Sequence, residues 1–425
     1  MSLRQKCFRR FRFLPAILFI VSASAAEPHW KFDFGPGPVQ SGYTQVLSTC
    51  VYSRANGFGF EPGAHVSDVD RQRGNDLKRD FCTSTAPFYF SVAVPEGNYR
   101  VTVTLGDRQD GSTNTIKVEL RRLMIQNVIT RPGKFSQQTF MVNIRTPKID
   151  STRAVKLKER ERTSEIWAWD EKLTLEFNGA RPCICAVEIE SATKVPTVFL
   201  LGDSTVCDQP SEPWNSWGQM LTRFFKPTLA IANHAESGET LKNSIAAGRL
   251  EKVLSLMRPG DYLFIQYGHN DMKDRSTNAL ANYKSNLKRF VNSTREKGGI
   301  PVLITSMERK AGVDHETLGA YPDTVRTVAR EENVPLIDLN AMSKVLYRAL
   351  GTHLDQAFQD GTHHNNYGSY ELAQCVVKGI KDLKLPLAKH LSKDFKSFDP
   401  RHPDPIENFN IPASPGARGE KPLGD

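Results

Sequence analysis

Hydrophobic and polar residues follow two different patterns in the two halves of the chain. From 27 to 192, short apolar runs alternate with polar residues and are separated by Gly, Pro, Asn and Asp. In 88–94 and 99–105, for example, every second side chain is apolar. Further β-rich runs lie at 32–35, 172–177 and 185–189. No segment of this half keeps a helical period. The pattern predicts an antiparallel β-sandwich domain over 27–192.

The pattern changes near residue 195. Residues 198–201 form a continuous apolar run, which is typical of a strand buried on both faces of a parallel sheet. Similar runs follow at 229–232, 262–266, 302–305 and 336–339, and they alternate with helix-like stretches at 241–256, 280–295, 318–332 and 370–383. Alternating strands and helices predict an α/β domain over 195–390, with a flavodoxin-like, doubly wound parallel sheet.

The two ends of the chain have their own compositions. Residues 1–26 contain five basic residues, then the short apolar run 13–21, then small residues at 24–26, which predicts a secretory signal peptide. The apolar run is short for a membrane span, so we expect a secreted or periplasmic protein without stable membrane association after signal cleavage. Residues 391–425 are Pro-rich and aperiodic, which predicts an extended tail that wraps the surface and has a disordered end.

Charge and cysteine content narrow the class of protein. The net charge is +9, and removal of the five basic residues of the signal leaves +4. The basic run 153–162 is interleaved with glutamates, so we interpret it as a solvated loop or strand edge and expect no nucleic-acid partner. Six cysteines remain after signal removal. They permit either free buried thiols or a disulfide from Cys50 or Cys82 to Cys183 or Cys185. No ligand spacing typical of a metal site is present.

Three residues have the chemistry of a serine hydrolase. Ser204 directly follows the first strand of the α/β region, where open α/β sheets bind ligands, although such a serine also serves as a helix N-cap. His363 can take a proton from the serine hydroxyl and return it to a leaving alcohol, and Asp360 can orient its ring. A serine hydroxyl needs such a base because it is a weak nucleophile at neutral pH. The alternative base is His364, but the Asp-x-x-His spacing favours His363.

Two further positions suit the stabilisation of an oxyanion. Asn270 follows the third strand of the predicted sheet, and its side-chain amide can donate a hydrogen bond there. Gly238 follows the second strand, where a glycine allows the backbone N–H to approach a ligand. The alternatives are a turn-forming asparagine and an ordinary loop glycine.

Aromatic residues are candidates for contact with a sugar ring. Trp214, beside a proline and an asparagine, is the better candidate in the α/β region, whereas Trp217 suits a helix core. We also assign a substrate contact to His269. Trp167 and Trp169 alternate with an alanine and therefore share one face if extended, either in the core or as a platform for a glycan.

The spacing of these motifs resembles a known family. Gly-Asp-Ser-Thr at 202–205, Gly238, Gly-His-Asn-Asp at 268–271 and Asp-Gly-Thr-His at 360–363 are similar to the four blocks of the SGNH (GDSL) hydrolases. Within that superfamily, residues 195–383 resemble the rhamnogalacturonan acetylesterases. The Phe-Asp-Phe-Gly-Pro-Gly segment resembles the start of the galactose-binding-like β-domain that precedes some bacterial members.

The resemblance implies Ser204 as nucleophile, His363 as base and Asp360 as its orienting partner. It implies an oxyanion hole made of the Ser204 N–H, the Gly238 N–H and the Asn270 side chain. We therefore expect a carboxylic ester hydrolase that removes O-acetyl groups from pectic polysaccharide, with an acetylated polysaccharide as its partner and no cofactor or metal.

One position departs from the family. Glu239 stands where members often have arginine, which weakens an expectation of strong affinity for polygalacturonate. The alternatives are an acetylesterase for xylan or another acetylated glycan, a general GDSL esterase or lipase, and a non-catalytic glycan-binding protein with a degenerate hydrolase fold.

Overall fold

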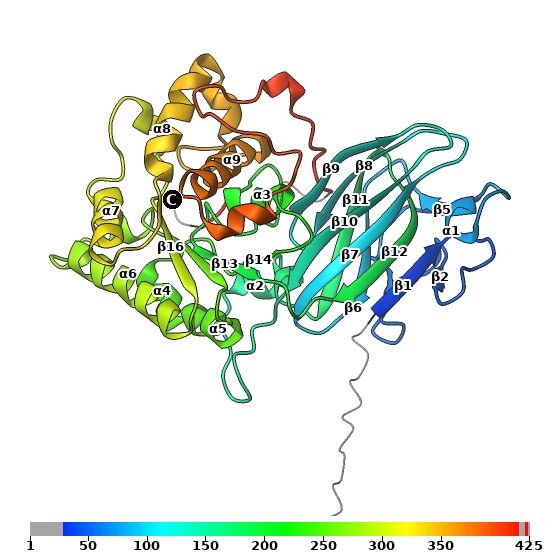
Figure 1. The fold of residues 1–425 in the computed structure, drawn as a ribbon, viewed down its shortest axis with the longest axis horizontal. Coiled ribbons are helices and arrows are strands. Elements are labelled where there is room, and N and C mark those ends of the chain that lie inside the picture. The colour runs from blue at the N-terminus through cyan, green and yellow to red at the C-terminus, as the bar shows by residue number, and fades with distance from the viewer. Residues whose placement is uncertain (1–28, 416–420, 424–425) are drawn as a thin grey trace, which may run out of the picture.

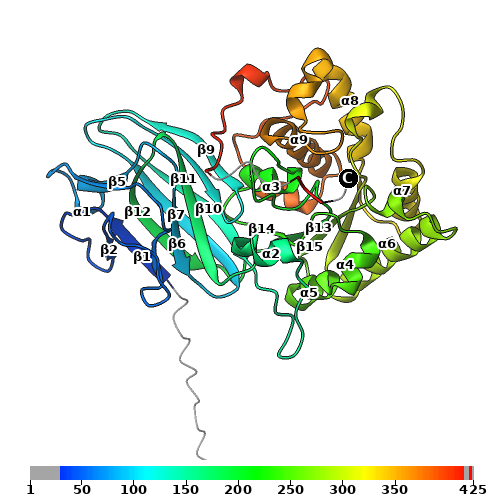
Figure 2. The ribbon, with the colours of Figure 1, turned by 180° about the vertical axis from the view of Figure 1, so that it is seen from behind.

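The computed structural model describes residues 29–415 and 421–423. A β-rich domain lies beside an α/β domain, as Figure 1 shows, and Figure 2 shows the same arrangement from behind. The predicted signal peptide at 1–26 lies outside the described residues. Within the described part, no helix is both long and apolar enough to cross a bilayer.

The β-rich domain consists of two sheets. The larger contains β1 (His29–Phe34), β2 (Thr44–Val46), β4 (Ser67–Asp70), β5 (Asp80–Thr83), β7 (Gly97–Gly106), β10 (Phe135–Ile144) and β12 (Cys183–Ser191). Its order is β10-β7-β12-β1-β2, with β5 paired to β12 and β4 to β5. The smaller contains β3 (Phe58–Phe60), β6 (Phe88–Ala93), β8 (Ser112–Val118), β9 (Arg122–Thr130) and β11 (Lys172–Arg181), in the order β3-β6-β11-β8-β9. All pairings are antiparallel except β1 with β2.

The core of this domain lies between the two sheets. Phe34 and Val103 of the larger sheet and Phe90 and Leu175 of the smaller sheet belong to one buried cluster. Because alternate residues of a strand point to opposite faces, each strand gives one apolar face to this shared core. The predicted antiparallel sandwich is therefore confirmed.

The α/β domain has a five-stranded parallel sheet. Its strands are β13 (Thr197–Gly202), β14 (Ala230–Asn233), β15 (Tyr262–Gln266), β16 (Ile300–Ile304) and β17 (Leu336–Ile337), in the order β14-β13-β15-β16-β17. Val198 and Leu200 belong to the core on one face, and Phe199 and Leu201 to the core on the other. Burial on both faces explains the continuous apolar run and confirms the predicted doubly wound sheet.

Helices cover both faces of this sheet. They are α3 (Trp217–Leu221), α4 (Leu241–Ala246), α5 (Arg249–Leu256), α6 (Ala279–Glu296), α7 (Tyr321–Glu331), α8 (Leu339–Leu350) and α9 (Asn366–Asp382). The predicted helix at 241–256 is two helices, because Gly248 adopts a left-handed conformation with a φ of 78° between them. The predicted strand at 336–339 ends early, because Asp338 caps the N-terminus of α8 by accepting a hydrogen bond from Ala341.

The β-rich domain contains two short helices, α1 (Asp76–Arg79) and α2 (Glu159–Arg162). The interpretation of 153–162 as a solvated segment was wrong for part of this run, because Glu161 in α2 is fully buried. Its carboxylate pairs with Arg249 of the α/β domain. A charge run cannot reveal such pairing, because its partner lies far away along the chain.

The C-terminal segment follows the surface of both domains. Phe409 packs against Tyr367 and Tyr370 of α9, and Ser414 donates a hydrogen bond to Glu176 of β11. The extended, wrapping path agrees with the prediction for the tail. The predicted disordered end includes 416–420 and 424–425, which lie outside the described residues.

The structure decides between free thiols and a disulfide for the cysteines. All six from Cys50 to Cys375 are free thiols, and five of them are buried. Cys183 and Cys185 pack in one cluster with Phe81, on the same face of β12, as their spacing predicts.

Candidate active site

Three loops meet where three neighbouring strands of the parallel sheet end. Ser204 follows β13, Gly238 follows β14 and Asn270 follows β15, and these strands are neighbours in the sheet. Carboxyl ends of parallel strands share one edge, so the topology brings together residues that are distant in sequence. A side chain at Gly202 would clash, since its Cβ would lie 2.5 Å from Val206 and 2.7 Å from the Gln266 carbonyl.

Ser204, His363 and Asp360 form a hydrogen-bonded chain. His363 Nε2 lies 2.8 Å from the Ser204 hydroxyl, and His363 Nδ1 lies 2.8 Å from Asp360 Oδ2. The other carboxylate oxygen of Asp360 accepts hydrogen bonds from the backbone N–H groups of His363, at 2.6 Å, and Thr362, at 2.7 Å. These distances suit proton transfer from the serine hydroxyl to a histidine held in one orientation.

The environment of Asp360 favours its ionised form. Burial raises its pKa, but the hydrogen bonds from the side chain and backbone of His363 outweigh burial and hold the pKa below its usual value. An ionised Asp360 can therefore stabilise a positive charge on His363.

The alternative base, His364, has a different partner. Its Nε2 lies 2.9 Å from the Tyr347 hydroxyl, and burial lowers its pKa to about 3. The described contacts thus place His363, and not His364, against the serine. Trp214 is half-buried and meets the His363 ring edge to face, with ring centroids 5.9 Å apart. Trp214 therefore lies beside the base, and its contact with a substrate stays a prediction.

The two predicted oxyanion positions are held together. Asn270 Nδ2 donates to the carbonyl of Glu239, the residue after Gly238, at 3.1 Å, and Lys273 donates to Asn270 Oδ1 at 3.3 Å. These bonds fix which end of the amide carries its donors and leave the amide one further N–H. Gly238 adopts a φ of 72°, which favours glycine.

Sequence reasoning missed the residue that links these loops. Gln209 Nε2 donates to the Ser204 carbonyl at 2.6 Å and lies 3.4 Å from the Ser237 hydroxyl. It therefore joins the nucleophile loop to the loop of Gly238. Neither its type nor its place in the sequence distinguishes it from other buried glutamines.

His269 has partners within the protein. Its Nε2 lies 3.0 Å from the Met307 carbonyl, and its Nδ1 lies 3.4 Å from Asp203. Burial raises the pKa of Asp203, but His269 outweighs burial and holds that pKa below its usual value. Asp203 in turn accepts hydrogen bonds from Thr205, on the far side of Ser204. Substrate contact by His269 stays a prediction, and the described contacts show it supporting the nucleophile loop.

Comparisons with known proteins agree with this geometry. Residues 200–369 match the GDSL-like lipase/acylhydrolase family. The rhamnogalacturonan acetylesterase RhgT of Bacillus subtilis is 38% identical over 216 residues, which are 46% of this chain and 93% of the relative. The chain belongs to the GDSL-like lipase/acylhydrolase family.

Two other relatives from Bacillus subtilis extend the comparison. The probable rhamnogalacturonan acetylesterase YesY is 34% identical over 46% of this chain and 98% of its own length. The uncharacterized esterase YxiM is 28% identical over 85% of this chain and 93% of its own length. Residues 30–150 match the galactose-binding-like domain of the beta-agarase/YxiM esterase-like group. This GDSL-like hydrolase is a carboxylic ester hydrolase with a galactose-binding-like domain.

The β-rich domain of this GDSL-like hydrolase contacts the loop that contains Gly238. Lys158 donates to the carbonyl of Ser237 and lies 2.9 Å from Glu239, so the residues on both sides of Gly238 bind the same ammonium group. Burial and the neighbouring Glu165 raise the pKa of Glu236 well above its usual value. The loop that contains α2 is therefore part of the support for the site.

These contacts change the interpretation of Glu239, the residue that departs from the family pattern. Its side chain is almost fully buried, and Lys158 and Arg249 lie 2.9 and 3.7 Å from it. Because two cations neutralise this carboxylate, it does not present a free negative charge to a substrate.

The C-terminal segment of this GDSL-like hydrolase also reaches the site. A Cβ atom placed on Gly238 would lie 3.1 Å from the Cβ of Leu423. Lys421 Nζ lies 3.5 Å from Asp360 Oδ2. Leu423 in the described part of the tail therefore lies against Gly238, the glycine of the candidate oxyanion hole.

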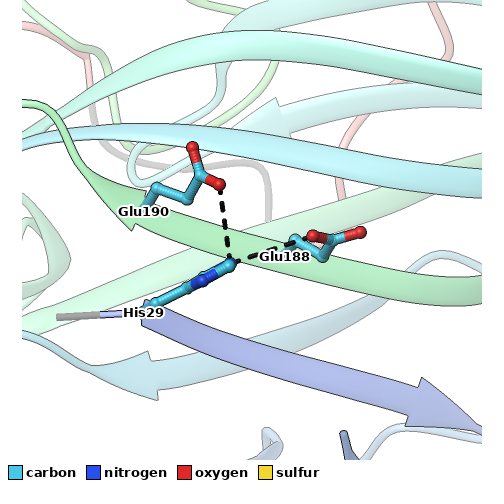
Figure 3. Close-up of side chains that lie close together, drawn as sticks. All are labelled: His29, Glu188 and Glu190. Atoms are coloured by element: carbon cyan, nitrogen blue, oxygen red, sulfur yellow. Dashed lines mark ion pairs between the residues drawn. The ribbon is translucent and has the colours of Figure 1, made fainter. Parts of the chain in front are cut away.

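One group of potential metal ligands occurs among the described residues, in the β-rich domain. Figure 3 shows His29 of β1 close to Glu188 and Glu190 of β12, with His29 Nε2 3.8 and 3.6 Å from their carboxylates. Lys31 lies 3.9 Å from Glu188, and Arg100 lies 3.7 Å from Glu190. Since both carboxylates already have cationic partners, we interpret this cluster as a surface ion-pair network.

Proposed function

We propose that this protein is a carbohydrate esterase that removes O-acetyl groups from rhamnogalacturonan by a Ser-His-Asp mechanism. The observation that carries the proposal is the hydrogen-bonded chain from Ser204 through His363 to Asp360, with 2.8 Å at each side-chain step. The choice of substrate rests on the identities of 38% and 34% to relatives that are named as rhamnogalacturonan acetylesterases.

In the first half of the reaction, His363 Nε2 takes the hydroxyl proton of Ser204 as Oγ attacks the acetyl carbonyl carbon. The carbonyl oxygen becomes an oxyanion, which accepts hydrogen bonds from the backbone N–H groups of Ser204 and Gly238 and from the Asn270 amide. The bond to the sugar oxygen then breaks, and His363 returns the proton to that oxygen. An acetyl-serine remains.

In the second half, water replaces the sugar. His363 removes a proton from the water as it attacks the acetyl carbon, the same donors hold the second oxyanion, and the bond to Oγ breaks. The proton returns to Ser204 Oγ, and acetate leaves. Asp360 remains ionised throughout and stabilises the positive charge on His363.

The proposed setting is outside the cytoplasm, either secreted or periplasmic. The basic and apolar segments of residues 1–26 support this proposal, and plant-type polysaccharides are substrates that an extracellular enzyme meets. Neutralisation of Glu239 by Lys158 removes one objection to a uronate-containing polymer.

Acetate release tests the proposal. Wild-type protein and Ser204→Ala should be compared on acetylated rhamnogalacturonan and on acetylated xylan. We expect release from the pectic polymer, and a loss of at least about 10⁴-fold in the folded variant. Preference for xylan would replace the substrate and keep the mechanism. Near-normal turnover by the variant would overturn the assignment of the nucleophile.

A further inference from the structure

The turn that joins β8 to β9 reaches into the α/β domain. It comprises Glu119, Leu120 and Arg121, since Val118 of β8 pairs with Arg122 of β9. Glu119 and Arg121 adopt left-handed conformations, with φ values of 53° and 64°, although neither is a glycine. Non-glycine residues keep this conformation only where their surroundings hold it. The shape of the turn is therefore set by contacts outside it, and those of the Arg121 side chain lie in the α/β domain.

The guanidinium of Arg121 binds two segments of the α/β domain. Its Nη1 donates to the backbone carbonyls of Gln209 and Trp214, at 3.2 and 2.9 Å. Its Nη2 lies 2.6 Å from the carboxylate of Glu212 and donates to the side-chain oxygen of Asn366 at 3.3 Å. The first three acceptors belong to the loop after β13, and the fourth belongs to the first residue of α9. Arg121 is only 5% exposed, so it is enclosed by these segments and does not face a substrate.

One of these contacts leads to the nucleophile. The side chain of Gln209, whose carbonyl accepts from Arg121, donates to the Ser204 carbonyl at 2.6 Å. The same Gln209 carbonyl also accepts a hydrogen bond from Gln219 of α3 at 3.0 Å. Only Gln209 therefore stands between the Arg121 guanidinium and the backbone of the nucleophile.

Two other contacts lead to the base. Trp214, whose carbonyl accepts from Arg121, meets the His363 ring with the ring centroids 5.9 Å apart. Asn366 lies three residues after His363 and also accepts a hydrogen bond from Asn215 at 2.8 Å. The loop after β13 and the start of α9 are thus joined to each other beside the base.

The hydrogen bond between Ser204 and His363 depends on both segments. These residues are 159 positions apart, and their 2.8 Å distance requires that the loop after β13 and the segment before α9 keep their relative positions. A planar guanidinium donates in fixed directions, so Arg121 restricts its acceptors more than a flexible ammonium group does. A shift of about 1 Å in a reacting pair can lower turnover by about 10²-fold.

The charge of Arg121 is neutralised within the protein. Burial raises the pKa of Glu212, but Arg121 and Lys117, which lies 3.8 Å from the same carboxylate, outweigh burial and hold that pKa below its usual value. An ionised Glu212 at 2.6 Å balances the guanidinium. The contacts of Arg121 therefore serve the arrangement of the loops and not the attraction of a charged substrate.

We propose that Arg121 is a positioning residue of the esterase reaction, through which the β-rich domain sets the distance between Ser204 and His363. The proposal deepens the proposed function and rests on it, because this pair must perform the reaction. It gives the β-rich domain a task in catalysis that requires no ligand of its own.

Turnover of a small aryl acetate by the full chain with Arg121→Ala tests this role. We expect kcat to fall by about 10²-fold and KM to stay within about 2-fold of the wild-type value, because the buried guanidinium does not touch substrate. Circular dichroism at the assay temperature gives the folded fraction, to which each kcat is normalised. A wild-type kcat in the folded variant would overturn the positioning role.

Arg121→Lys separates positioning from the pairing of charges, and it remains informative if Arg121→Ala does not fold. A lysine can pair with Glu212 but lacks the fork that binds the carbonyls of Gln209 and Trp214. We therefore expect the melting temperature to return towards the wild-type value while kcat stays at least about 10-fold lower. If kcat recovered together with the melting temperature, charge pairing alone would suffice and the proposal would be wrong.

Glu96→Gln is the control for the contact between the domains. Glu96, just before β7, pairs with the fully buried Lys252 of α5 at 2.7 Å, and neither β7 nor α5 contains a candidate site residue. We expect a lower melting temperature, because a buried ammonium group loses its partner, and an unchanged kcat. An equal loss of kcat in Glu96→Gln and Arg121→Ala would mean that turnover responds to any loosening between the domains, which contradicts a specific role of Arg121.

Failure of this inference and failure of the proposed function give different results. If Ser204→Ala is inactive but Arg121→Ala has the wild-type kcat, the mechanism stands and the positioning role is wrong. If Ser204→Ala keeps its turnover, the proposed mechanism is wrong, and the role of Arg121 in that mechanism is wrong with it.

Discussion

The buried ion pair between Glu161 and Arg249 allows a quantitative test of how the two domains are joined. Arg249 donates to both carboxylate oxygens of Glu161, at 2.9 and 2.6 Å, and the backbone N–H of Lys158 donates to one of them at 2.8 Å. The two side chains are 1% and 0% exposed. Glu161→Gln keeps the shape of the side chain and removes its charge, so it leaves the guanidinium buried without its main partner.

Removal of one member of a buried pair costs about 3–5 kcal/mol. Glu239 remains 3.7 Å from Arg249 and retains part of the compensation, so we expect the lower end, about 3 kcal/mol. For a domain of ordinary size, this loss corresponds to a decrease of roughly 6–12 °C in melting temperature. Thermal unfolding followed by circular dichroism would measure it.

The control lies in the same short helix. Glu159 pairs with Arg162 at 3.3 Å, and these side chains are 81% and 60% exposed. Because exposed pairs contribute about 0–1 kcal/mol, Glu159→Gln should leave the melting temperature almost unchanged. Equal melting temperatures for Glu161→Gln and the wild type would refute the view that this pair is desolvated and joins the domains.

Three other predictions concern the site and the α/β domain. Asn270→Ala should lower kcat on an aryl acetate by about 10²–10³-fold with little change in KM, because one oxyanion donor is lost. Steady-state kinetics would measure both constants, and a change confined to KM would contradict this role. A chain that ends before residue 416 lacks Leu423, which lies against Gly238 and is 49% exposed. We expect access to Gly238 to improve and kcat/KM to rise by about 5-fold, which corresponds to about 1 kcal/mol of leucine contact. An unchanged kcat/KM would show that the tail does not obstruct the site. Burial raises the pKa of Glu371 to about 8 from an ordinary value of 4.5, so its protonated form stabilises the fold at low pH and this stability is lost as pH rises through 8. The free energy of unfolding of Glu371→Gln, taken relative to that of the wild type, should therefore increase from pH 5 to pH 8. The same difference between the two proteins at both pH values would refute this.

The candidate triad was predictable because each part has a local signature. Ser204 follows an apolar strand, and Asp360 lies three residues before His363, so a short loop brings these two side chains together. The position of Asn270 follows from the rule that parallel strands end at one edge of the sheet. The sequence therefore indicates both the chemistry and the edge of the sheet at which it occurs.

Residues that support the site were not predictable in the same way. Lys158 lies 79 residues before Ser237, whose carbonyl it binds, and Glu161 lies 88 residues before Arg249. In the sequence, these charged residues look the same as a solvent-exposed segment of charged residues. Their burial depends on the packing of one domain against the other, which no local period encodes.

The tryptophans also show the difference between what sequence predicts and what packing decides. Trp167 and Trp169 share a face only in an extended strand, but they lie in and just after a short 3₁₀ turn. Trp169 therefore packs in the core, whereas Trp167 is half-buried at the surface. The amino-acid sequence alone determined the strands, the parallel sheet and the reactive side chains, because these depend on local periodicity and on chain direction. Tertiary structure decided which charges are neutralised, which tryptophan is buried and which residue lies against Gly238, because burial depends on partners that come from distant parts of the chain.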